Sequence, residues 1–192
     1  MTIFDFAMVA VSLILGLAVS YLLESIVDVF RARHRCRMDW IPFVWTGCVL
    51  VQQFQFWWAL YELNTISSLS VGMFSLLLFL SGLLFIAGAL VLPSGETEYP
   101  DDLGVYFNTD GSWAAAALAL FNLAAAGANT LLFGEPIADI VNLLSLVLVV
   151  IASLVAVTRK RGLQVRLTAG YVIFLVLDEI IATRVIYVNT GG

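Results

Sequence analysis

The chain has 192 residues, of which 61% are hydrophobic and only 12% are charged, and its mean hydropathy is +1.00. A soluble domain carries about 25% charged residues, so this chain has too little polar surface for a water-soluble fold. The formal net charge of −5 argues against nucleic acid as a partner. The composition therefore predicts a single-domain, all-α membrane protein in contact with the lipid bilayer.

Six apolar stretches near the crossing length of about 20 residues predict a bundle of six transmembrane helices. Strands of a β-barrel would be shorter and would alternate polar with apolar residues, which these stretches do not. In chain order, the expected spans are about 6–30, 40–61, 69–92, 113–133, 136–158 and 165–188.

The first predicted span carries small and polar residues at four-residue spacing: Gly16, Ser20, Glu24 and Asp28. This spacing places them on one helix face, which is expected to face protein or water. Glu24 and Asp28 approach the arginines of RARHRCR, so they indicate either a charge-paired helix end or carboxylates that line a cytoplasmic vestibule. No positively charged segment precedes the span, which is therefore expected to be retained rather than cleaved as a signal peptide.

Polar residues also occur within the second and fourth predicted spans. Gln52, Gln53 and Gln55 lie at a depth similar to that of Asn122. Gln52 and Gln55 share a helix face because they are three residues apart. The aromatic residues at both ends of the second span are interpreted as interfacial anchors. The fourth span is rich in alanine, which lets its backbone approach neighbouring helices closely.

The stretch 93–112 is expected to be a cytoplasmic loop with a short interfacial helix around DDLGVYF. Residues 94–112 include five acidic residues and no Lys or Arg. Acidic residues weigh little in membrane orientation, so this composition does not contradict a cytoplasmic location. The loop is a candidate surface for binding another protein.

Asp178 and Glu179 lie side by side in the sixth predicted span, near the middle of the membrane. Inserting an ionisable group at a helix centre costs about 2.5–3.5 kcal/mol, so at least one carboxyl is expected to face Gln52, Gln53 or Gln55. Two interpretations remain open. The residues form either a packed hydrogen-bonded layer with one carboxyl protonated, or a site for a proton or small cation.

Arg184 is expected near the outer end of the sixth span, level with Asp139 at the start of the fifth. An arginine at membrane depth needs a partner. The pair is interpreted as a structural ion pair, with a substrate clamp as the alternative.

The orientation follows from the Lys and Arg residues, since eight of the nine lie in two loops. Cytoplasmic loops carry an excess of Lys and Arg, which places both loops in the cytoplasm and both termini outside. An even number of spans between the two loops agrees with this placement. The eight residues are Arg31, Arg33, Arg35, Arg37, Arg159, Lys160, Arg161 and Arg166.

The sequence offers little for catalysis. His34 is the only histidine, which excludes a bis-histidine haem and an HExxH zinc site. Cys36 and Cys48 form neither a CxxC motif nor a disulfide framework. A phosphate-binding glycine loop and a GxSxG motif are also missing. No cofactor, metal site or catalytic residue is predicted, and enzymatic activity has the least support.

The motifs LGLAVSYLLESI, FQFWWALY and LVLPSG…DDLGVYF, with a basic turn after the first, resemble those of a group of small bacterial inner-membrane proteins. The resemblance covers residues 1–115 and implies a multi-pass protein of the bacterial inner membrane, without an activity to carry over. The six short helices also resemble bacterial relatives of the lysosomal potassium channels in architecture alone, because the Phe-Ser-Asp motif of that family is missing.

Two functions follow from these patterns. The midplane carboxyls and glutamines favour a homo-oligomeric channel or transporter for protons or small cations. The acidic loop favours a non-catalytic scaffold or accessory subunit that binds a partner protein. An intramembrane enzyme would be a third class.

Overall fold

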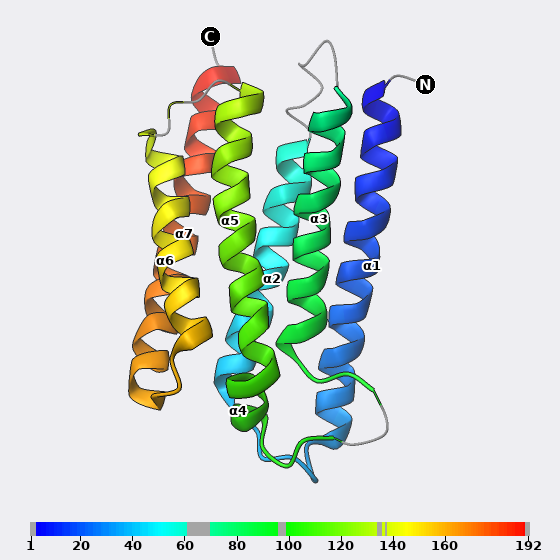
Figure 1. Cartoon of the computed structure of the whole chain (residues 1–192), viewed down its shortest axis with the longest axis vertical. Helices are drawn as coiled ribbons and strands as arrows, with labels where there is room; N and C mark the ends of the chain where they lie inside the picture. The colour runs from blue at the N-terminus through cyan, green and yellow to red at the C-terminus, as the bar shows by residue number, and fades with distance from the viewer. Residues whose placement is uncertain (1–2, 61–69, 96–98, 134–135, 137, 191–192) are drawn as a thin grey trace.

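The computed structural model describes residues 3–60, 70–95, 99–133, 136 and 138–190, and over these residues the fold is all-α. Side chains are described for the same residues except 3–4, 132–133 and 182–190. A short helix α4 (Leu103–Tyr106) and a π-helix η2 (Phe107–Gly111) precede α5. Six long helices make up the bundle in Figure 1: α1 (Ile3–Ala32), α2 (Trp40–Ala59), α3 (Val71–Val91), α5 (Ser112–Phe133), α6 (Ile140–Val157) and α7 (Arg161–Thr190).

Four helical segments are long and apolar enough to cross a membrane, which makes the chain a multi-pass membrane protein by length and composition. They are Asp5–Ala32, Val71–Val91, Leu103–Leu131 and Ile140–Val157. Helices α2 and α7 are also long, with 20 and 30 residues, but glutamines in one and charged residues in the other reduce their hydropathy. The predicted number of six spans and the orientation of the termini therefore stay predictions.

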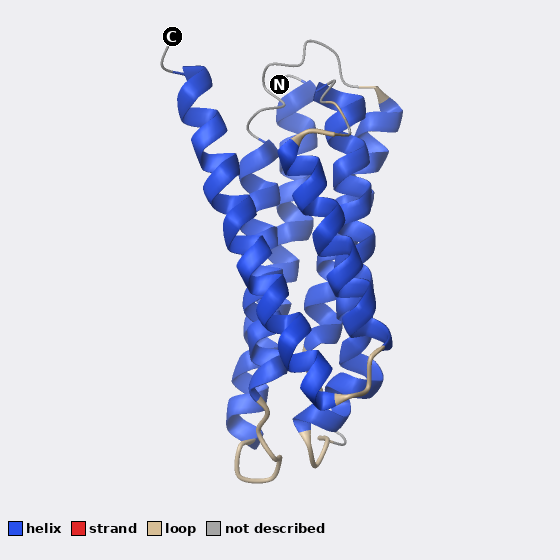
Figure 2. Cartoon of the chain, turned by 90° about the vertical axis from the view of Figure 1, so that its left-hand side faces the viewer, coloured by secondary structure: helices blue, strands red, loops and turns tan. Residues whose placement is uncertain are grey.

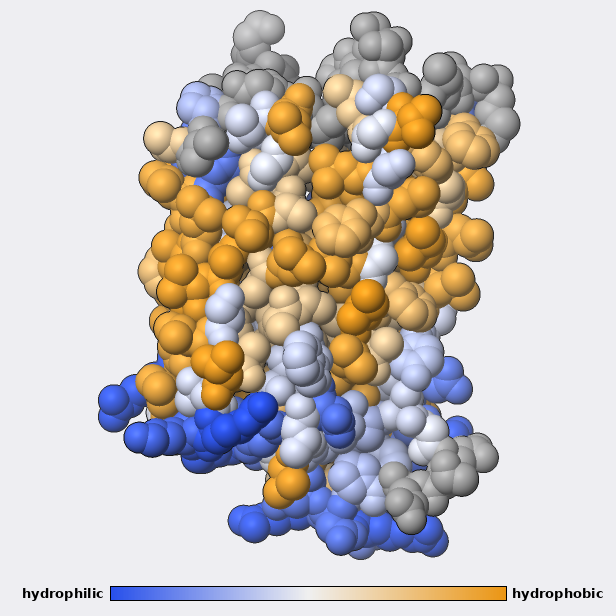
Figure 3. Space-filling model, in the orientation of Figure 1, coloured by the Kyte–Doolittle hydropathy of each residue, from blue (hydrophilic) through white to orange (hydrophobic). Residues whose placement is uncertain are grey.

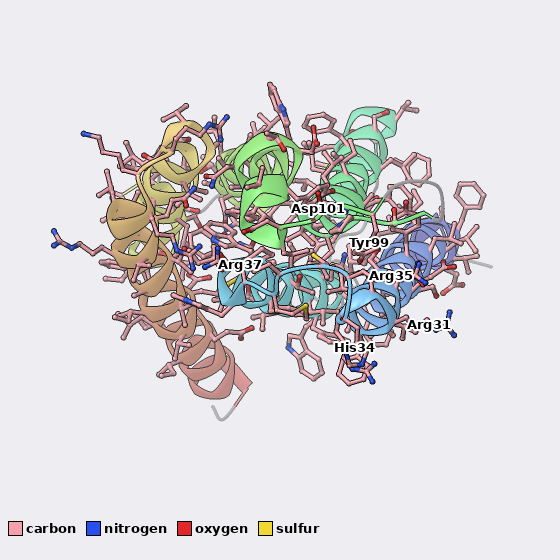
Figure 4. All side chains as sticks on the ribbon, turned by 90° about the horizontal axis from the view of Figure 1, so that it is seen from below. Arg31, His34, Arg35, Arg37, Tyr99 and Asp101 are labelled. Carbon is pink, nitrogen blue, oxygen red and sulfur yellow. The ribbon has the colours of Figure 1, made fainter. Side chains whose placement is uncertain are left out.

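The six long helices form two layers of three, seen end-on in Figure 4. One layer holds α6, α5 and α3, and the other holds α7, α2 and α1, so that α2 lies between α1 and α7. Figure 2 shows that α7 diverges from the other helices toward the end of the bundle where the C-terminus lies. An apolar band covers most of the face drawn in Figure 3, whereas hydrophilic side chains gather at its lower end.

The bundle is apolar both inside and outside, so side-chain packing holds the helices together. Trp45, Leu84 and Leu118 are fully buried between the layers, while Leu13 and Val150 are exposed on the outside. The small side chains of α5 behave as expected, since six of its nine alanines are buried and the helix packs against α3 and α6. The fully buried members are Ala114 and Ala115.

The predicted loop 93–112 is too long, because helical structure begins at Leu103 and continues through η2 into α5. The carboxylate of Asp102 caps this start by accepting hydrogen bonds from the backbone N–H groups of Gly104 and Val105, at 2.7 and 3.2 Å. Phe107–Gly111 forms the π-helix, although the low helix propensity of its Gly and Asn residues favours a loop. The expected short interfacial helix is therefore the first turn of a longer helical segment, Leu103–Leu131, that is long and apolar enough to cross a membrane.

The small and polar stripe of α1 lies on the outer surface of the bundle, where no other helix of the chain packs against it. Gly16, Ser20 and Glu24 are exposed, and only Asp28 is half-buried. Helix α1 packs on its neighbours through a different face, made of apolar residues at spacings of four and three. These are Val11, Leu15, Ala18 and Leu22, all of them buried.

Candidate functional site in a polar seam between α2, α5 and α7

One face of α7 carries polar side chains at alternating spacings of three and four residues, which keeps them in a single line along the helix. We call this line the polar seam: Arg161, Gln164, Thr168, Tyr171 and Asp178 of α7 with their partners on α2, η2 and α5. Leu175 completes the spacing and is the one apolar position in the line. The seam rises about 25 Å from Arg161 to Asp178 at 1.5 Å per residue.

The lower end of the seam fastens the start of α7 to the start of α2. The guanidinium of Arg161 binds both carboxylate oxygens of Asp39, with 2.9 Å between Nη2 and Oδ1. Asp39 is also the N-cap of α2 and accepts a hydrogen bond from the backbone N–H of Ile41 at 2.8 Å. One carboxylate therefore fixes both the beginning of α2 and its distance from α7.

The next two positions of the seam, Gln164 and Thr168, are buried and hydrogen-bonded. The amide of Gln164 donates to Asn108 Oδ1 at 2.6 Å and to the carbonyl oxygen of Thr158 at 2.9 Å. Thr168 Oγ1 accepts a hydrogen bond from Trp45 Nε1 at 3.1 Å. The Trp45 ring also packs on the ring of Tyr171, with 4.6 Å between the ring centroids.

A closed ring of three hydrogen bonds crosses the centre of the seam. Gln52 Nε2 donates to Asn122 Oδ1 at 2.8 Å, and Asn122 Nδ2 lies 3.3 Å from the Tyr171 hydroxyl. That hydroxyl donates in turn to Gln52 Oε1 at 3.2 Å. All three side chains are buried, so the ring joins α2, α5 and α7 through groups that have no access to solvent.

Asp178 lies at the upper end of the seam. Its Oδ2 accepts a long hydrogen bond of 3.5 Å from Gln55 Nε2, and its side chain is partly buried. Within the described part of the chain, Asp178 Oδ1 is buried and has no hydrogen-bond partner. Glu179 is also partly buried and lies about 100° around the helix from Asp178, yet its carboxylate also interacts with the Gln55 side chain.

Gln53 is separate from the seam and faces α3. Its amide donates to the carbonyl oxygen of Leu84 at 3.3 Å, while no donor among the described residues reaches its Oε1. The close approach depends on Gly88, where an added Cβ would lie 3.3 Å from Gln53 Nε2. Gln53 is thus a contact between α2 and α3.

Of the residues that the sequence singled out, the structure brings Gln52, Gln55, Asn122 and Asp178 into the seam and excludes Gln53. The expected approach of Asp178 to a glutamine of the second span is therefore confirmed, with Gln55 as the partner. Their use as an ion site stays a prediction. The sequence reading missed the seam below Asn122, although the spacing of polar residues along α7 signals it. The missed members are Asp39, Trp45, Asn108, Arg161, Gln164, Thr168 and Tyr171.

The remaining predicted residues lie away from the seam. Asp28 pairs with Arg31 at 3.7 Å, which agrees with a charge-paired helix end, while Glu24 is exposed. Asp139 is the N-cap of α6 and accepts a hydrogen bond from the backbone N–H of Val141 at 3.1 Å. The side chain of Arg184 lies outside the described residues, so its expected pairing with Asp139 stays a prediction.

The segments that connect the helices contact one another at the lower end of the bundle. Arg37 forms a backbone bridge with the segment around Asp102 and an ion pair with its carboxylate at 3.8 Å. Burial, followed by the negative charge of Asp102, raises the pKa of the Cys36 thiol beside this bridge. Two of the five loop acids, Glu96 and Glu98, lie outside the described residues.

Comparison with known proteins identifies no relative: no family model, curated protein or solved structure matches the chain. Within the described residues, no group of three His, Cys, Asp or Glu side chains is placed to hold a metal ion. Among the side chains that the structure describes, the seam offers one carboxylate oxygen without a donor, Asp178 Oδ1, above a ring of neutral polar groups. A carboxylate oxygen is an acceptor, so the group suited to it is a donor, a proton or a cation.

Proposed function

We propose that the protein is a bacterial inner-membrane protein with six spans and both termini outside, and that it moves protons or small cations along the polar seam. The observation that carries the proposal is Asp178, whose Oδ1 is buried without a hydrogen-bond partner in the described part of the chain. An acidic residue within a transmembrane bundle is costly and usually marks an ion or proton path.

The geometry of the seam supports a transport cycle with two states. The ring of Gln52, Asn122 and Tyr171 blocks passage while α7 packs against α2 and α5. Helix α7 is held at its lower end by the Arg161–Asp39 pair and diverges at its other end (Figure 2). A small rotation of α7 about this fixed end would break the ring. Protonation of Asp178 would neutralise its carboxylate, which removes the charge that opposes movement of this side chain through the apolar interior.

Six spans receive support from contacts at one end of the bundle. Asp39 before α2 binds Arg161 at the start of α7, and Arg37 binds Asp102 before α4. Loops that touch must lie on the same side of a membrane, which requires α2 to cross it. The positive-inside rule then places these loops in the cytoplasm.

We also propose that the protein is a homo-oligomer in which α1 packs against a second copy. The exposed small residues Gly16 and Ser20 permit close helix approach, and exposed Glu24 is costly toward lipid. Disulfide cross-linking of Ser20→Cys in a background without Cys36 and Cys48 tests this. Absence of a dimer band under oxidation would count against this part of the proposal.

The transport proposal is tested by flux into liposomes that contain the purified protein. Asp178→Asn is expected to reduce proton or cation flux by at least about tenfold, which corresponds to about 1.4 kcal/mol in the barrier. Asp110→Asn is the matched control, because Asp110 is exposed and outside the seam, and its flux should equal that of the wild type. No flux in the wild type, or equal flux in Asp178→Asn, would refute the proposal.

The alternative of a scaffold that binds a partner through the acidic loop has less support. Asp102, one of the five acids, caps α4 and pairs with Arg37, so it contributes to the fold of this chain. The transport assay bears on this alternative too, since a scaffold would conduct nothing.

A further inference from the structure

The turn between α6 and α7 presents cations that the fold leaves without counter-charges. Arg159, Lys160 and Arg166 are all exposed, and none forms an ion pair within the described part of the chain. The fourth cation of this turn, Arg161, is held by Asp39. This pair fixes the position of the turn against the bundle. The other three cations have no carboxylate partner among the described residues, and Arg159 donates only a 3.4 Å hydrogen bond to the backbone carbonyl of Ala156.

The other basic segment, at the end of α1, differs because much of its charge is already engaged. Arg31 pairs with Asp28 at 3.7 Å, and Arg37 pairs with Asp102 at 3.8 Å. Arg33 lies over the ring of Phe30, with 4.7 Å from its guanidinium carbon to the ring centroid. Figure 4 shows that the labelled residues of this segment are spread from the edge of α1 to the middle of the bundle beneath α2.

An exposed apolar strip leads along α6 to the cations of the α6–α7 turn. Val150, Leu154 and Val157 follow one another at spacings of four and three residues, so they share one outer face of the helix. Val157 is 73% exposed and lies two residues before Arg159. In Figure 3, strongly hydrophilic side chains cover the region of this turn, directly below the apolar band.

We infer that the α6–α7 turn is a binding site for the headgroup of an anionic phospholipid. Arg159, Lys160 and Arg166 contact its phosphate, and an acyl chain lies along Val150, Leu154 and Val157. The charge selects an anion, and the apolar strip beside it selects an anion that carries hydrocarbon. A soluble phosphate ester would use the cations and leave the strip uncovered.

The test measures binding of fluorescent phosphatidylglycerol to the full-length protein in phosphatidylcholine nanodiscs. The wild type is expected to prefer phosphatidylglycerol over labelled phosphatidylcholine. The triple variant R159Q/K160Q/R166Q should lose about fivefold in affinity for each cation removed. The control R31Q/R33Q/R35Q removes the same charge from the other basic segment and should retain most of the affinity. If the triple variant does not fold, the single variants K160Q and R166Q replace it.

Three results would overturn the inference. The triple variant, or both single variants, could bind phosphatidylglycerol as tightly as the wild type. The control could lose as much affinity as the triple variant, which would indicate general attraction to the basic end of the bundle. Water-soluble glycerophosphoglycerol or inorganic phosphate could compete as well as the lipid does, which would identify a site for a soluble anion instead.

Discussion

At the scale of single residues, the hydrogen-bond ring decides how three helices meet. Each member of the ring both donates and accepts, so Gln52, Asn122 and Tyr171 satisfy one another without water. Leaving a buried polar group without a partner costs more free energy than a typical hydrogen bond contributes to stability, because the desolvation of that group is no longer compensated. The ring therefore selects one register of α7 against α2 and α5.

Replacing Tyr171 by Phe should destabilise the bundle, because it removes two of the three bonds of the ring and leaves Gln52 Oε1 unpaired. The expected loss in the free energy of unfolding is about 1–2 kcal/mol. This lies between the small net value of a hydrogen bond in a membrane protein and the larger cost of a buried unpaired group in a water-soluble protein. The measurement is the thermal unfolding midpoint in detergent. Tyr21→Phe is the control, since the Tyr21 hydroxyl bonds Ser94 at an exposed position. Equal shifts for both variants would contradict the special role of the ring.

At the scale of elements, the starts of α2 and α4 are packed against each other through a glycine. A Cβ added at Gly104 would lie 2.6 Å from Asp39 Oδ2 and 3.1 Å from Asp102 Oδ1. These two carboxylates cap α2 and α4, and each also binds an arginine of another segment. The absence of a side chain at Gly104 thus lets two helix caps share one small volume.

Gly104→Ala is therefore expected to lower stability by about 1–3 kcal/mol, because the methyl group displaces the Asp39 carboxylate from its cap or from Arg161. Gly127→Ala is a matched control in α5, where an added Cβ meets nothing within 4 Å. Alanine has the higher helix propensity by about 1 kcal/mol, so the control should be neutral or stabilising. Unfolding of both variants in the same detergent gives the comparison, and a neutral Gly104→Ala would show that the caps tolerate the shift.

At the scale of the whole molecule, composition and apolar length were sufficient to predict an all-α membrane bundle, because these depend on the solvent around the chain. Side-chain contacts across helices were predictable only where the sequence gave a depth, as for Gln55 and Asp178. The start of helical structure at Leu103 could not be predicted from the sequence, since the cap formed by Asp102 and the π-helix override the low helix propensity of this segment. Nor could the outward direction of Glu24, because lipid-facing and protein-facing sides of α1 are both apolar.

Labelling of single cysteines can decide whether four or six helices cross the membrane. If only the four most apolar segments crossed the membrane, the loop after α1 and the turn before α7 would lie on opposite sides. Six spans place them on the same side, in agreement with the contacts of Asp39 with Arg161 and of Arg37 with Asp102. A chain without Cys36 and Cys48 therefore serves as the background for single cysteines at Arg35 and Lys160.

Both single cysteines, Arg35→Cys and Lys160→Cys, are expected to react with a membrane-impermeant maleimide only after the cells are opened, since both positions are exposed and the proposed topology places them in the cytoplasm. Ser70→Cys, at the start of α3, should react in intact cells, because a single crossing by α2 separates it from Arg35. Labelling of Arg35→Cys and Lys160→Cys from opposite sides would remove α2 from the set of spans, because α2 is the long helix between these two positions that is not among the four most apolar segments. It would also contradict the contact between Arg161 and Asp39, and with it the lower end of the polar seam.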